Sequence, residues 1–164
     1  MISPRLQQDI LEKVKSSRLT IIVGPTGCGK STCVPPLLLE QLGGPVLVTQ
    51  PRRLAVVAVA TRVADQLGIE LGKGDVGYHI GQHNLSSNQT QLLFTTAGIL
   101  LEELRANGLG ALTRFQCILI DECHERSPES DLCLTIIKSF MQRHPRARIH
   151  LVLMSATFNR DRYR

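Results

Sequence analysis

The sequence predicts an α/β domain built on a mainly parallel central sheet, and two observations support this fold class. Short apolar runs alternate with longer segments of helical periodicity along the 164 residues. The apolar runs are rich in Val, Ile and Leu with little polar alternation, which is typical of strands covered on both faces. Strand–helix alternation at this spacing predicts right-handed crossovers, and therefore parallel strands between two layers of helices.

The expected elements follow one another without a repeat, a low-complexity tract or a linker. The apolar runs predict five buried strands, at residues 19–23, 45–49, 91–95, 117–121 and 149–155. The segments between them predict five helices, at residues 5–15, 30–42, 54–67, 98–107 and 129–143. Residues 68–88 are richer in Gly and polar side chains, which predicts loops with a short strand around residues 78–81.

Composition and charge exclude several classes of protein. The first eleven residues are polar and charged, unlike a signal peptide. The longest apolar run, at residues 54–60, is too short to span a bilayer, so we expect an intracellular protein, cytoplasmic or nuclear, without a membrane partner. Five cysteines without a C-x-x-C pair favour free thiols over a zinc or disulfide framework. The net charge of +5 permits a phosphate-rich partner without identifying one.

A glycine-rich loop follows the first predicted strand and opens the second predicted helix. Residues 24–31 fit the phosphate-binding pattern G-x-x-x-x-G-K-[ST] in full. Glycines let backbone N–H groups converge on phosphate oxygens, and the helix N-terminus adds its positive dipole end. We expect Lys30 to reach the β- and γ-phosphates of ATP and the Ser31 hydroxyl to ligate Mg²⁺. The expected nucleotide contacts are Gly24, Pro25, Thr26, Gly27, Cys28, Gly29, Lys30, Ser31 and Thr32.

Two carboxylates end the strand predicted at residues 117–121. Asp121 is expected to hold the Mg²⁺ shell, and Glu122 to orient or deprotonate the attacking water beside the metal. His124 begins a His-Glu pair, but Pro128 stands where a zinc protease would need its second histidine. His124 is either a plain loop histidine or a polar link from the nucleotide site to the rest of the protein. The predicted catalytic set is Lys30, Asp121, Glu122 and His124, and the predicted metal set is Ser31, Asp121 and Glu122.

With these residues the sequence resembles the DEAH/RHA group of superfamily 2 helicases along nearly its whole length. Residues 24–32 resemble motif I, and residues 49–55, Thr-Gln-Pro-Arg-Arg-Leu-Ala, resemble motif Ia. Residues 96–101 resemble motif Ib. Residues 121–127 read Asp-Glu-Cys-His-Glu-Arg-Ser, a variant of the DEAH box, and residues 155–157, Ser-Ala-Thr, match motif III.

Two positions depart from the family pattern. Cys123 replaces the usual Ala of the DEAH box, and we expect little effect because cysteine is a small, mostly buried hydrophobe. Ala97 replaces the usual Asp of motif Ib, which changes the expected backbone contact of this loop. Thr96 and Gly98 keep the pattern.

The resemblance implies the first RecA-like lobe of an ATP-dependent RNA helicase, a three-layer P-loop NTPase domain. It implies ATP hydrolysis coupled to translocation on single-stranded RNA, with DNA as an alternative track because backbone contacts read charge and shape. It implies backbone contacts by Thr49, Arg52, Arg53, Thr96 and Gly98, coupling by Ser155, Ala156 and Thr157, and Arg62 on the adenine face. Arg52 has a structural role as its alternative.

The family motor has two RecA-like lobes, and residues 1–164 hold the motifs of the first alone. We therefore expect a helicase ATP-binding domain that is a fragment, with the second lobe as its partner. The alternative function for such a fragment is a nucleotide- and RNA-binding module without turnover.

Overall fold

The structure of the protein is a computed structural model that describes residues 1–157. A single seven-stranded sheet runs through it. The strand order is β1-β7-β6-β2-β5-β3-β4, and every neighbouring pair is parallel except β3 and β4. The strands are β1 (Leu19–Val23), β2 (Val46–Gln50), β3 (Val76–Ile80), β4 (His83–Leu85), β5 (Leu92–Thr96), β6 (Cys117–Ile120) and β7 (His150–Ser155). The α/β class with a mainly parallel sheet is therefore confirmed.

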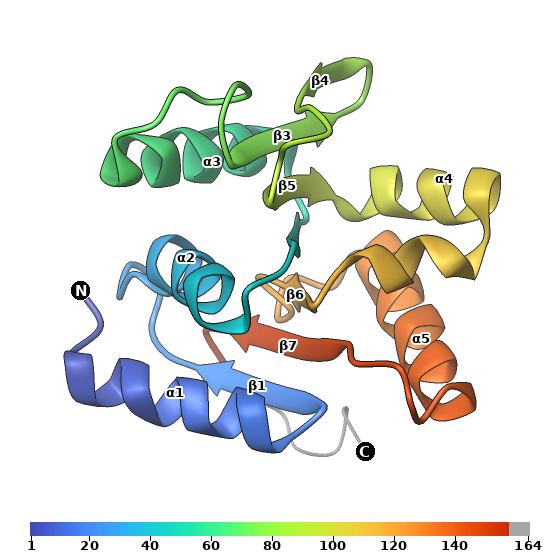
Figure 1. The fold of residues 1–164 in the computed structure, drawn as a ribbon, viewed down its shortest axis with the longest axis horizontal. Coiled ribbons are helices and arrows are strands. Elements are labelled where there is room, and N and C mark those ends of the chain that lie inside the picture. The colour runs from blue at the N-terminus through green and yellow to red at the C-terminus, as the bar shows by residue number, and fades with distance from the viewer. Residues whose placement is uncertain (158–164) are drawn as a thin grey trace.

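Helices connect most of the parallel strands, as Figure 1 shows, whereas β3 is joined to β5 through β4. Local sequence explains where two of them begin: Ser3 and Ser127 each precede a proline, and each hydroxyl accepts a hydrogen bond from a backbone N–H of the first turn. The helices are α1 (Pro4–Ser16), α2 (Lys30–Leu42), α3 (Arg53–Leu67), α4 (Ala97–Asn107), the 3₁₀ helix η1 (Leu109–Arg114) and α5 (Pro128–Arg143). Within the described residues, no helix is long and apolar enough to cross a membrane.

Alternation along the central strands divides the core into two layers. In β2, Val46 and Val48 belong to the layer that α1, α2 and α3 cover, whereas Leu47 belongs to the layer that α4, η1 and α5 cover. Leu119 and Ile118 of β6 divide in the same way. Because side chains of a strand alternate between its faces, strands buried on both sides need apolar residues at every position. This is why their sequences read as unbroken apolar runs.

Most predicted elements match the observed ones within one or two residues, and the bounds of β1 and α2 are as predicted. Two elements were not predicted. Strand β4 is a three-residue, exposed edge strand that turns back antiparallel to β3 through Gly81, at φ 44°. Helix η1 lies in a segment with two glycines and lacks a long apolar stripe. Both are too short to produce a periodic signal.

Parallel strands place their carboxyl ends at one edge of the sheet, where the predicted site residues follow. Gly24 comes directly after β1, Asp121 directly after β6, and Ser155 ends β7. Thr96 ends β5. In open α/β sheets, ligands bind outside this edge. The topology thus brings motifs far apart in the sequence to one side of the molecule.

At the opposite edge, Arg18 ties the start of β1 to the end of α5. Its guanidinium donates hydrogen bonds to the backbone oxygens of Met141 (2.9 Å), His144 (3.1 Å) and Ala147 (3.3 Å). The last carbonyls of a helix have no partner within the helix, so Arg18 supplies the missing donors.

Replacing Arg18 with Ala should therefore destabilise the domain. We expect Arg18→Ala to lower the free energy of unfolding by about 1.5–3 kcal/mol, the usual range for a hydrogen bond to a charged group. Urea denaturation followed by circular dichroism measures this change. Arg5→Ala, in the exposed first turn of α1, is the matched control and should cost less than about 0.5 kcal/mol. Equal losses in the two variants would contradict this role of Arg18.

Candidate functional site

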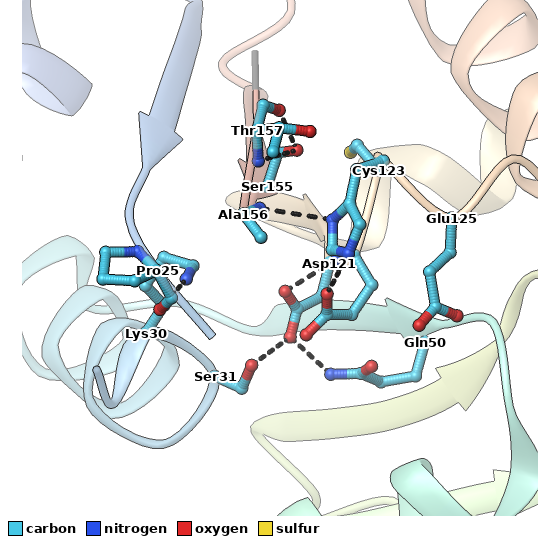
Figure 2. A network of polar contacts seen from close by, with 12 residues as sticks. Pro25, Lys30, Ser31, Gln50, Asp121, Cys123, Glu125, Ser155, Ala156 and Thr157 are labelled. Carbon is cyan, nitrogen blue, oxygen red and sulfur yellow. Dashed lines mark hydrogen bonds and ion pairs between the residues drawn. The ribbon is translucent and has the colours of Figure 1, made fainter. Parts of the chain in front are cut away.

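The phosphate loop connects β1 to α2 and holds a buried lysine. Gly27 and Gly29 adopt left-handed backbone conformations, at φ 82° and 94°, which only glycine takes without strain. The side chain of Lys30 is 7% exposed, and its ammonium donates to the backbone oxygens of Gly24 and Pro25, the latter at 3.0 Å. Figure 2 shows the lysine under the loop. The loop therefore encloses a positive charge whose hydrogen-bond partners are backbone oxygens and the Cys28 sulfur, which suits an anion.

Asp121 joins three elements at the carboxyl edge of the sheet, and it is 1% exposed. One carboxylate oxygen accepts from the Ser31 hydroxyl at 2.5 Å and from the Gln50 amide, and the other accepts from the Glu122 N–H at 2.8 Å. Figure 2 shows Ser31 and Gln50 converging on this carboxylate. Burial raises the pKa of Asp121, while the hydrogen bonds and the charge of Lys30 oppose the rise.

The donor atoms around Asp121 fit a magnesium ion. A hydroxyl oxygen from Ser31 and a carboxylate oxygen from Asp121 are hard oxygen ligands, the kind that Mg²⁺ takes in small number while keeping several waters. A divalent cation would also offset the cost of burying the carboxylate charge. Ser31 and Asp121 thus come together as the predicted metal set requires, and Glu122 lies beside them in the chain.

Glu122 has an unusual backbone conformation. Among residues 1–157 it is the one non-glycine residue with positive φ, at 54°. Such conformations cost free energy and cluster at functional sites. Its carboxylate lies 3.2 Å from His124 Nε2 and is about one-quarter exposed. Burial, and next the charge of Asp121, raise the pKa of Glu122 above its ordinary value, while His124 lowers it. A raised pKa makes this carboxylate a stronger general base.

His124 bridges Glu122 and the end of β7. The backbone N–H of Ala156 donates to His124 Nδ1 at 3.2 Å, and Nε2 faces Glu122. Because Nδ1 accepts from an amide, Nε2 carries the proton and donates to the carboxylate. Thr157 N–H donates in turn to the Ser155 hydroxyl at 3.2 Å. Of the two alternatives for His124, this geometry fits the polar link.

An open cavity of about 230 Å³ adjoins the phosphate loop. It brings Arg62 of α3 to the same space as Lys30 and Glu122, although these residues are far apart in the sequence. The lining residues are Thr26, Gly27, Gly29, Lys30, Ser31, Thr32, Arg62 and Glu122. Three other predicted nucleotide contacts, Gly24, Pro25 and Cys28, instead line a cavity of about 590 Å³ toward α1.

A second, smaller cavity brings motifs Ia and Ib together. Arg53, Thr96 and Gly98 line about 190 Å³ beside the start of α5. The Thr96 side chain also caps α4, accepting from the Ile99 N–H at 3.4 Å. Arg53 is exposed. Three of the predicted nucleic-acid residues therefore share one surface.

The other two predicted nucleic-acid residues do not line this cavity. Thr49 is 1% exposed and its hydroxyl is buried, so its side chain is out of reach of a nucleic acid; this corrects the expectation of a direct contact. Arg52 forms an ion pair of 3.0 Å with Glu125, in the loop after the acidic box. Arg52 thus fits its structural alternative, as a connection between motifs Ia and II.

Two residues of the site were not predicted. Gln50 is 2% exposed and donates to Asp121, and its position between Thr49 and Pro51 in motif Ia was the available signal. Gly81, in the turn between β3 and β4, lies against Arg53: a Cβ on this glycine would be 3.5 Å from the guanidinium carbon. Nothing in the sequence pointed to Gly81, because the contact depends on an edge hairpin that periodicity does not reveal.

The sequence is similar to known helicases over nearly all of its length. The DEAD/DEAH box helicase family model matches residues 4–164. A zinc finger CCCH domain-containing protein 4 of Oryza sativa subsp. japonica is 48% identical over 162 residues, 97% of this chain and 16% of that protein. The DExH-box ATP-dependent RNA helicase DExH8 of Arabidopsis thaliana is 48% identical over 159 residues, which are 97% of this chain and 15% of that protein. The ATP-dependent RNA helicase DHX29 of Mus musculus is 41% identical over 169 residues, which cover 96% of this chain and 12% of that protein.

The contact between Gln50 and Asp121 predicts that Gln50 supports metal-dependent nucleotide binding. Gln50→Leu keeps the approximate volume and removes the donor that orients the carboxylate. We expect affinity for ATP with Mg²⁺ to fall about tenfold, or about 1.4 kcal/mol, and affinity for ATP without Mg²⁺ to change much less. Titration calorimetry measures both. Gln89→Leu, on the exposed loop before β5, is the control. Equal losses with and without the metal would mean that Gln50 only supports folding.

Proposed function

The chain belongs to the DEAD/DEAH box helicase family, and we propose that it is the ATP-binding motor lobe of a DExH-type ATP-dependent RNA helicase. One observation carries the proposal: Lys30, Ser31, Asp121 and Glu122 converge at the sheet edge that also presents Arg53 and Thr96. A phosphate site and a backbone-binding surface on the same edge are what a nucleic-acid motor needs.

The nucleotide is held by the phosphate loop. Lys30 offers its ammonium to the β- and γ-phosphates, in exchange for its present contacts with loop carbonyls. Ser31 and Asp121 would hold Mg²⁺, which would neutralise charge on the phosphates. Glu122, with its raised pKa, accepts a proton from the attacking water, and His124 fixes the position of its carboxylate. Arg62 lines the same cavity, and its planar cation is proposed to stack on the adenine base.

RNA is held by its backbone. Arg53 and Thr96 offer a guanidinium and a hydroxyl to phosphate and sugar, and the space beside Gly98 lets the backbone approach closely. These groups carry no base specificity, so we propose a single-stranded track independent of sequence. DNA offers the same phosphates, so the affinities for single-stranded RNA and single-stranded DNA at equal salt distinguish the two tracks.

Turnover is proposed to use a second lobe besides the residues described above. The chain spans 12 to 16% of the length of the three relatives described above. We propose that a second RecA-like lobe completes the site with an arginine, a group worth about 10³ to 10⁵ in rate in other NTPases. The test is phosphate release with and without single-stranded RNA, before and after a second lobe is joined; RNA-stimulated release from the single lobe would contradict this division.

Glu122 should be needed for chemistry and not for binding. Glu122→Gln keeps the shape and an oxygen that accepts from His124, but it removes the base. In a protein carrying both lobes, we expect ATP affinity within about twofold of the original and hydrolysis slower by about 10²-fold or more. Titration calorimetry and phosphate release measure these quantities. Glu40→Gln, exposed on α2, is the control. Hydrolysis at the original rate in Glu122→Gln would assign the base elsewhere.

Arg53 should contribute to RNA affinity through charge alone. Arg53→Ala is expected to weaken the binding of single-stranded RNA of any sequence to the same degree, and to reduce the slope of log affinity against log salt by about one unit. Fluorescence anisotropy across a salt series measures the slope. Arg105→Ala, exposed on α4, should leave the slope nearly unchanged. A loss confined to particular sequences would instead indicate base reading.

A further inference from the structure

The positive charge of the chain is concentrated in two short segments. Residues 13–18 and 138–150 hold seven of the nineteen Lys and Arg and none of the fourteen Asp and Glu. In the remainder of the sequence, acidic residues therefore outnumber Lys and Arg. The net charge of +5 thus originates in these two segments.

The fold places the two segments side by side. Arg18 donates to the backbone oxygens of His144 and Ala147, and His150 Nδ1 donates to the Ser17 oxygen at 3.0 Å. In Figure 1, the α1–β1 and α5–β7 connections lie together at the tails of the β1 and β7 arrows. We name the basic edge the four exposed cations that lie nearest the two connections in the sequence, which are Lys15, Arg143, Arg146 and Arg148; Lys13 is also exposed, two residues earlier in α1.

The basic edge is separate from the proposed nucleotide and RNA sites. It lies where β1 and β7 begin, whereas the phosphate loop and motif III follow the ends of the same strands. Strands of five and six residues, with a rise of about 3.3 Å per residue, put roughly 17–20 Å between the two edges. A nucleic acid bound at Arg53 therefore does not account for these charges.

Local structure explains only part of this charge. Lys15 and Arg143 lie in the last turns of α1 and α5, where cations stabilise the helix dipole. Arg146 and Arg148 lie beyond α5, so the dipole gives them no such role. The ion pairs found within residues 1–157 use cations elsewhere. The basic edge thus presents cations without carboxylate partners to an external anion.

We propose that the basic edge binds the phosphodiester backbone of base-paired RNA. This inference rests on the proposed function and deepens it, because it adds a duplex-binding surface to a lobe that moves on a single strand. The composition favours this partner. Among Phe, Tyr and Trp, segments 13–18 and 138–150 contain Phe140 alone, which is 4% exposed, so this surface offers none of the aromatic residues that are enriched in the cores of protein interfaces. Unpaired bases also need aromatic side chains on which to stack.

Geometry supports phosphate as the group that is recognised. Arginine presents a planar set of donors that fits phosphate oxygens, and three of the four cations of the basic edge are arginines. Duplex RNA is recognised mostly through its shape and its phosphates, without access to base edges in the deep groove. A surface that offers charge without an exposed Phe, Tyr or Trp matches that mode of binding.

The test compares two triple variants that lose the same charge. One is R143Q/R146Q/R148Q in the basic edge, and the control is R5Q/K73Q/R105Q, all exposed positions outside the motifs. Fluorescence anisotropy with a short blunt RNA duplex and with single-stranded RNA, over a salt series, gives affinity and salt slope. We expect the basic-edge variant to lose at least about tenfold in duplex affinity and about two to three units of slope, with single-strand binding retained. The control should lose less than about one unit.

Further measurements make each outcome decisive. Thermal unfolding and ATP titration establish that the variants fold, and Arg148→Gln alone should lose about one unit of slope if the triple variant does not fold. Unchanged duplex affinity, or equal losses in both triple variants, would overturn the proposal. Poly-glutamate that competes as well as duplex RNA at equal charge would point to an acidic protein instead, and would also overturn it.

The proposed function is tested separately in the same experiment. Arg53→Ala should weaken the binding of single-stranded RNA and leave the affinity of the basic edge for duplex RNA unchanged. If Arg53→Ala leaves single-strand affinity intact while the basic-edge variant loses the duplex, the proposed track fails and the basic edge stands. The reverse result removes the basic edge alone.

Discussion

The buried carboxylate of Asp121 is the constraint on which the rest of the site depends. At 1% exposure its charge is costly, and the fold offsets that cost with donors from α2, from β2 and from the next residue of its own chain. The donors from Ser31 and Gln50 reach Asp121 only if β6 lies beside β2 and α2 begins next to both. The ionised state of one side chain is therefore coupled to the packing of three elements, and a cation bound there would reinforce the same arrangement.

Two short connections lead away from the carboxylates of Asp121 and Glu122. Gln50, which holds Asp121, is the last residue of β2, and the chain reaches Arg53 three residues later. Glu122 contacts His124, which accepts from the backbone of motif III. A shift of either the loop between Gln50 and Arg53 or the end of β7 would thus displace Asp121 or Glu122 through one or two hydrogen bonds. This is a physical route for coupling, because each connection is a direct contact between groups that the two sites share.

Much of the site could be predicted because parallel strands gather their carboxyl ends. The phosphate loop and the acidic box each follow an apolar run, and topology alone brings Ser31 to Asp121. Strand order was not predictable, because it is set by long-range packing. The contact of Gln50 with Asp121 needs β2 beside β6, and the burial of Thr49 needs neighbours on both sides of β2. The Arg52–Glu125 ion pair likewise joins two loops whose approach no local pattern encodes.

The two edges of the sheet use charge in opposite ways. At the carboxyl edge, Lys30 is buried among loop oxygens and Arg52 is paired with Glu125, so the fields of these two cations are local and specific. At the amino edge, the ion pairs of residues 1–157 include none of the arginines of the basic edge, so attraction there is general and extends outward. Since ions in solution screen charges beyond about 8 Å at physiological salt, edges roughly 17–20 Å apart act independently. One lobe can therefore hold a phosphate precisely placed for chemistry at one end and, at the other, attract a polyanion without regard to its sequence.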